Sequence, residues 1–180
     1  MKVFIAGARA VSVLDGVVKE RLNNIFIKNY TVVVGDASGV DCAVQRFFSN
    51  HRYRNVIIYA SEGKARNNIG SWAVHSVDVP IRSRGFDYYA AKDIAMANDA
   101  DYGFMIWNGE SKGTLNNIVN LINLDKKSIV YLTTNKEFYN IDGIDDLQEL
   151  VELCGQTAKN LFNKIVEASV MSRFQQISIF

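Results

Sequence analysis

The chain has 180 residues, 48% hydrophobic and 22% charged, which is enough apolar material for one packed domain, whereas two domains would be cramped. Its 20 Lys and Arg residues nearly balance 19 Asp and Glu, and the net charge of +1 argues against a polyanionic partner, an acidic tail or a membrane surface. The single proline excludes a Pro-rich linker, and the two distant cysteines, Cys42 and Cys154, exclude a disulfide framework and a Cys-based zinc site.

Five short apolar runs, β-branched and not alternating, predict strands of a parallel sheet that is covered on both faces. They lie at residues 3–6, 31–34, 56–59, 103–107 and 128–132. Segments with helical periodicity lie between and after them, at residues 14–26, 40–48, 86–97, 115–122, 144–151 and 157–171. This alternation predicts an α/β fold, Rossmann-like and doubly wound, with a mainly parallel sheet and helices on both faces.

Two further segments are less regular. Residues 61–83 are expected to form loops over a sheet edge, with a short strand within residues 72–79. The apolar end at 175–180 is expected to be strand-like, or an arm that adds to an edge of its own sheet or a partner's, which leaves a homodimer or higher homo-oligomer open. The first apolar run is too short for a signal peptide and no run could cross a bilayer, so a cytoplasmic protein is expected.

In open α/β sheets the ligand lies outside the carboxyl ends of the strands, so the loops after the apolar runs are the candidate site. The first loop, residues 7–10, lacks the GxGxxG spacing of dinucleotide-binding dehydrogenases. The loops at 35–41 and 107–114 are rich in glycine and small polar residues and each opens a helix, an arrangement that can present backbone N–H groups to a phosphate. Each loop alone is also explained by packing.

The sequence GDASGVDCAVQ at residues 35–45 resembles the G-x-A-x-G-x-D-x-A element of the SLOG superfamily, a Rossmann-like group. That group includes the lonely-guy phosphoribohydrolases and the DNA-processing protein A family. KDIAM at 92–96, AD at 100–101 and GESKGT at 109–114 resemble, in order, the second half of the same motif series. The resemblance implies a single SLOG-type domain over 1–180, with its core at about 3–133 and a C-terminal extension at 143–180. It is similar to the stand-alone bacterial or phage branch.

Two positions depart from the phosphoribohydrolase pattern. Asn117 stands where the resemblance implies a catalytic glutamate, and an amide cannot transfer a proton as a carboxylate does. Lys92 stands where an arginine is implied, which keeps the charge but loses the bidentate grip on phosphate. These changes favour binding over hydrolysis.

The main hypothesis is therefore a pocket at the carboxyl edge of the sheet that binds a nucleotide or ADP-ribose-like molecule, as a sensor or sequestering protein for a nucleotide-derived signal. The alternative is a nucleoside 5′-monophosphate N-glycosidase or phosphoribohydrolase, with Lys92, Asp36 and Asp93 as candidate catalytic residues. Handling of single-stranded DNA is disfavoured by the charge balance, so a long nucleic acid is not expected as a partner. No metal, cofactor or membrane partner is expected.

The predicted ligand-binding residues come from the three loops, the irregular middle segment and the predicted helix at 86–97. They are Gly7, Ala8, Arg9, Gly35, Asp36, Ser38, Gly39, Asp41, Arg82, Arg84, Lys92, Trp107, Asn108, Ser111, Lys112, Gly113, Thr114 and Asn117. For Trp107, stacking on a base competes with core packing, and for Arg82 and Arg84 closure over the ligand competes with a solvated loop.

Overall fold

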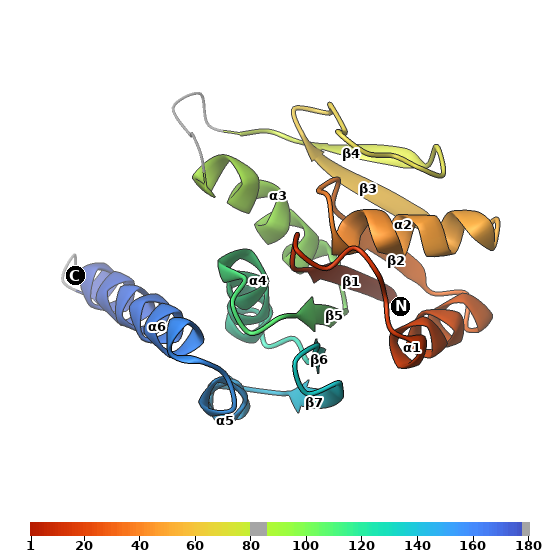
Figure 1. Cartoon of the computed structure of the whole chain (residues 1–180). Helices are drawn as coiled ribbons and strands as arrows, with labels where there is room; N and C mark the ends of the chain where they lie inside the picture. The colour runs from red at the N-terminus through yellow and green to blue at the C-terminus, as the bar shows by residue number, and fades with distance from the viewer. Residues whose placement is uncertain (80–85, 178–180) are drawn as a thin grey trace.

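The structure is a computed structural model that describes residues 1–79 and 86–177; for residues 86–89 and 168–177 it describes the helix but not the side chains. Figure 1 shows the strands as one layer with helices on its two sides. The strands are β1 (Lys2–Gly7), β2 (Thr31–Val34), β3 (Val56–Ser61), β4 (Ala73–Val77), β5 (Tyr102–Trp107), β6 (Ser128–Leu132) and β7 (Glu137–Ile141). The helices are α1 (Gly16–Ile27), α2 (Val40–Asn50), α3 (Phe86–Asp99), α4 (Lys112–Asn123), α5 (Ile144–Glu152) and α6 (Gln156–Ile177).

Within the described residues the strands form one seven-stranded sheet in the order β4-β3-β2-β1-β5-β6-β7. Neighbouring strands are parallel except for β7, which is antiparallel to β6. Because β1 pairs with β2 on one side and with β5 on the other, the order of the chain reverses direction at β1 and β5. The Rossmann-like α/β fold class predicted from the sequence is confirmed.

The strands β1, β2, β3, β5 and β6 are buried on both faces, which explains why their sequences are apolar without alternation. In β1, Phe4 and Ala6 belong to a core shared with α3 to α6, whereas Val3 and Ile5 belong to a core shared with α1 and α2. β4 lies at the sheet edge and is exposed over most of its length. These two cores hold the sheet between helices and leave only its edges and strand ends for other contacts.

Two expectations differ from the structure at the C-terminal side. The strand β7 was not predicted, because its five residues mix exposed charged and half-buried aromatic positions and carry no apolar run. The predicted strand-like end is wrong up to Ile177, because α6 continues through residues 175–177. Residues 178–180, and with them the rest of the predicted arm, lie outside the described residues. In Figure 1 α6 runs outward from α5 to the C-terminus.

No helix in the described part of the chain is both long enough and apolar enough to span a membrane.

Candidate functional site

A cavity of about 570 Å³ lies at the carboxyl ends of β1 and β5. This is where the strand order reverses, the position at which open α/β sheets bind ligands, because the loops after the two strands diverge there. Its walls come from the β1–α1 loop, the start of α2, one face of α3, and the β5–α4 loop with the first turns of α4. The cavity is the candidate functional site.

Most of the residues predicted from the sequence line this cavity. From the predicted set these are Gly7, Ala8, Arg9, Asp41, Lys92, Asn108, Ser111, Lys112, Gly113, Thr114 and Asn117, joined by the candidate catalytic residue Asp93. The position of each loop directly after an apolar run therefore predicted which segments come together around the cavity. It did not find the remaining lining residues Ala6, Ala10, Ala37, Ala90, Met96 and Glu110. Met96 carried a usable signal, because it follows Asp93 by three residues and so shares its face of α3.

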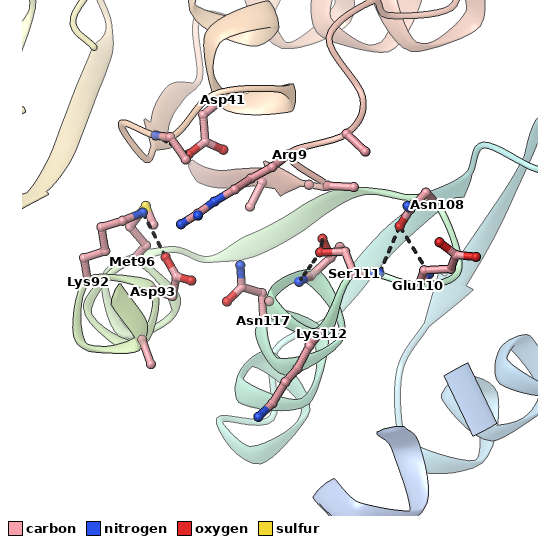
Figure 2. Close-up of a pocket in the computed structure, with 18 residues that line it drawn as sticks. Arg9, Asp41, Lys92, Asp93, Met96, Asn108, Glu110, Ser111, Lys112 and Asn117 are labelled. Atoms are coloured by element: carbon pink, nitrogen blue, oxygen red, sulfur yellow. Dashed lines mark hydrogen bonds and ion pairs between the residues drawn. The ribbon is translucent and has the colours of Figure 1, made fainter. Parts of the chain in front are cut away.

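The β1–α1 loop is held against its neighbours by backbone contacts. Ala8 donates its N–H to the carbonyl of Ile106 (3.1 Å) and accepts the N–H of Val40 (3.3 Å). Gly39 has φ +77°, and a Cβ at this position would lie 2.3 Å from the carbonyl oxygen of Arg9. Only glycine fits this close approach, and the contact holds the backbone of Arg9 in place against the start of α2. Figure 2 shows the Arg9 guanidinium extending across the pocket between α3 and α4.

The N-terminus of α4 forms the opposite wall. Ser111 caps the helix by accepting the N–H of Thr114 (3.3 Å) and the hydroxyl of Thr114 (3.0 Å) on its Oγ. The preceding turn is held by Asn108, whose Oδ1 accepts the N–H groups of Glu110 (3.2 Å) and Ser111 (2.9 Å). Lys112, Gly113 and Thr114, the first residues of α4, line the cavity, so the positive end of the helix dipole is directed at it. The first turn contains no acidic residue, and Glu110 lies just before it. Lys112 lines the cavity, but its ammonium points away from Arg9 in Figure 2.

Asn117 lies one turn further into α4 and is 4% exposed. Within the described part of the chain its Oδ1 is buried and has no hydrogen-bond partner. Figure 2 shows its amide directed from α4 toward α3, on the side of Asp93. An unpaired buried amide oxygen costs about 1–3 kcal/mol, so a ligand that donates a hydrogen bond to it would recover that free energy.

A buried charge cluster lies beneath the α3 wall, around Lys92. The Lys92 ammonium is 3.1 Å from Asp93 and 3.8 Å from Asp36. Asp36 also accepts three hydrogen bonds from Arg66, two from the side-chain atoms Nε (3.0 Å) and Nη2 (2.7 Å) and one from the backbone N–H (3.0 Å). Asp41, on α2, accepts the N–H of Ala37 (3.0 Å). The cluster connects α3, α2 and the β2–α2 loop across the floor of the site.

Burial and the neighbouring charges shift the pKa values of this cluster in different directions. Burial raises the pKa of Asp41 to about 6 and also raises the pKa of Asp93, although Lys92 opposes both shifts. Burial alone would raise the pKa of Asp36, but the hydrogen bonds from Arg66 and the charge of Lys92 outweigh it and hold that pKa below its usual range. Burial alone would lower the pKa of Lys92, but the three surrounding carboxylates hold it above its usual range. The charge of Lys92 is thus largely offset inside the protein.

Several predicted site residues do not line the cavity. Gly35, Asp36 and Gly39 are buried within the protein, where Gly35 makes room for Asp41 and Lys92 and Asp36 binds Arg66. Ser38 is exposed but does not line the cavity. Trp107 is fully buried and donates its indole N–H to the carbonyl of Ser111 (3.1 Å), so it does not present a face to a ligand. Arg82 and Arg84 lie outside the described residues. In the described part of the chain, no three His, Cys, Asp or Glu side chains lie together so that they could hold a metal ion.

No protein-family model matches the chain, and no curated protein is significantly similar to it in sequence. Among solved structures the chain is similar to DNA processing protein A from Helicobacter pylori, which was described for its single-stranded DNA binding mode. The two share 15% sequence identity with a TM-score of 0.56, over 93% of this chain and 81% of that one. At this identity the similarity establishes a shared Rossmann-like fold.

This comparison corrects two expectations. A small nucleotide-derived ligand, held by a sensor or sequestering protein, was expected, and a long nucleic acid was not; yet the similar structure is a single-stranded DNA-binding protein. The N-glycosidase alternative gains no support from it. The inference failed because net charge averages over the whole surface, whereas nucleic-acid binding depends on groups gathered at one place. What the chain resembles in structure is a DNA-processing protein with a Rossmann-like fold.

Proposed function

We propose that this protein binds single-stranded DNA, with one nucleotide of the strand seated in the cavity between α3 and α4. The observation that carries the proposal is the juxtaposition of Arg9, the N-terminus of α4 and the buried, unpaired oxygen of Asn117 in one cavity of about 570 Å³. Together these groups offer a cation and backbone donors to a phosphate and an acceptor to the N–H groups of a base edge.

The apolar part of the lining supports the same assignment. Ala8, Ala10, Ala37, Ala90 and Met96 provide an uncharged surface against which a sugar or base can pack. The similarity in fold to a DNA-processing protein supports a strand as the ligand. The resemblance of the loop motifs to the SLOG superfamily, whose members include the DNA-processing protein A family, adds a second support, and we include membership of that superfamily in the proposal.

The test is fluorescence anisotropy with a labelled oligothymidylate of about 16 nucleotides, with duplex DNA of the same length as competitor. We expect single strands to bind more tightly than duplex, because the cavity takes an unpaired nucleotide. Arg9→Ala should weaken binding by about tenfold and Lys112→Ala by about threefold, each without changing sequence preference, since phosphate contacts carry no sequence information.

The matched control is Lys19→Ala, which removes an exposed lysine from α1 and does not touch the cavity. Absence of single-strand binding at low salt would overturn the proposal. Equal effects of Arg9→Ala and Lys19→Ala would show that binding occurs elsewhere on the surface.

A further inference from the structure

A second cavity, of about 250 Å³, lies beside the first. It is formed by the β5–α4 loop, the residues that follow β6, and the connection between α5 and α6. Asn108 and Glu110 line both cavities, so the β5–α4 loop lies between the two.

The dividing loop is well ordered. Its carbonyl at Ser111 is bound by Trp107, and its N–H groups at Glu110 and Ser111 are bound by the Asn108 side chain, as described above. Gly109 has φ +76°, and a Cβ there would lie 3.4 Å from the sulfur of Cys154, so the loop packs directly against the α5–α6 connection. The loop is therefore a fixed ridge between the cavities.

The lining of the second cavity differs in chemistry from that of the first. Its hydrogen-bonding side chains are the amides of Asn108 and Asn135, the hydroxyls of Thr134 and Thr157 and the carboxylate of Glu110, and no lysine or arginine is present among the described residues that line it. Leu153 contributes an apolar side chain that is 56% exposed. The amides and hydroxyls match the donors and acceptors of a base edge, and an exposed leucine offers a surface to a base ring. A phosphate would find no cation there and would meet the carboxylate of Glu110.

We propose that the second cavity binds the base of the adjacent nucleotide of the same strand, whose backbone crosses the Asn108–Glu110 ridge. This inference rests on the proposed function, because it requires a strand whose first nucleotide occupies the larger cavity. It adds a specific claim, that the C-terminal elements α5 and α6 contribute a base subsite to the sheet pocket.

The experiment compares binding of thymidine 5′-monophosphate, the thymidine dinucleotide and a longer oligothymidylate. The wild-type protein should bind the dinucleotide about tenfold more tightly than the mononucleotide, and Leu153→Ala should remove about fivefold of that gain while leaving mononucleotide affinity unchanged. Leu153→Glu should remove more, because it adds a second carboxylate to the one that Glu110 already contributes to this cavity. Ile27→Glu, at another exposed apolar residue, 68% exposed on α1, controls for added charge and for folding.

The outcomes separate the two proposals. If Arg9→Ala weakens strand binding but Leu153 variants bind every length as Ile27→Glu does, the second subsite is wrong and the first stands. Equal affinity for the mononucleotide and dinucleotide also overturns the second subsite. If no single strand binds, both proposals fall. As an independent readout, a dinucleotide carrying a photoreactive base should crosslink to the peptide at 153–157, and crosslinks confined to α1 or α2 would contradict the proposed path.

Discussion

At the scale of single residues, Lys92 is the centre of the buried charge cluster beside the cavity. It is 4% exposed and shares its charge between Asp93 and Asp36, with Asp41 close by. Removing one partner of a buried, hydrogen-bonded charge cluster leaves other charges buried without compensation, which is more costly than any single contact in the cluster. The cluster therefore holds α3 in position at the wall of the cavity, and in the proposed function the positive groups offered to the strand are Arg9 and the N-terminus of α4.

Asp41 makes the stability of the protein depend on pH. Its pKa is raised from 3.8 to about 6 by burial, so the folded state binds this proton more tightly than the unfolded state. The resulting stabilisation is complete below the ordinary value and is lost as the pH rises through about 6. Between about pH 4 and pH 7 the free energy of unfolding of the wild type should fall by about 2 kcal/mol relative to Asp41→Asn, which keeps an acceptor for the Ala37 N–H.

Urea unfolding of both proteins at several pH values measures this difference. The comparison is needed because other groups in both proteins also titrate: Asp93 shifts stability in the same direction as Asp41 and Asp36 in the opposite one. Glu20→Gln, an exposed substitution on α1, is the control and should follow the wild type. Parallel curves for the wild type and Asp41→Asn would contradict the prediction.

At the scale of elements, the start of α4 has a structural and a binding role that two substitutions of Ser111 can separate. Ser111→Ala removes the acceptor for the N–H of Thr114 and should lower the free energy of unfolding by about 1 kcal/mol. Ser111→Asp keeps an acceptor and adds a charge that the helix dipole favours, so stability should be retained. Its carboxylate would, however, compete with a phosphate for the same N–H groups, and single-strand affinity should fall by about tenfold.

Thermal unfolding and anisotropy on the same two variants test this separation. Wild-type affinity for Ser111→Asp would show that no phosphate lies at the N-terminus of α4.

At the scale of the whole molecule, a net charge of +1 predicts weak long-range attraction to DNA and a shallow salt dependence. Arg9, Lys112 and the N-terminus of α4 can contact about two or three phosphates, so the slope of log affinity against log salt should be roughly −1.5 to −2 for a single strand. Anisotropy titrations over a range of salt concentrations give this slope directly. A slope several times steeper would mean that the strand follows a wider basic surface, outside the two cavities.

Much of this protein follows from its sequence alone. Uninterrupted apolar runs predict strands buried on both faces, and the glycine-rich and polar loops that follow them predict where the walls of a site meet, because strand burial and loop position depend on local pattern. Arg9, Asn108 and Ser111 were predicted in this way, and all three line the cavity.

Only the tertiary structure decided how the polar groups of those loops are used. Asp36, expected to face a ligand, is bound by Arg66, which lies 30 residues along the chain, and Trp107, expected beside a base, is buried in the core. The unpaired oxygen of Asn117 and the second cavity beside Leu153 also depend on how α3, α5 and α6 pack. Such pairings join residues distant in sequence, and the free energy that selects them comes from burial, which local spacing does not encode.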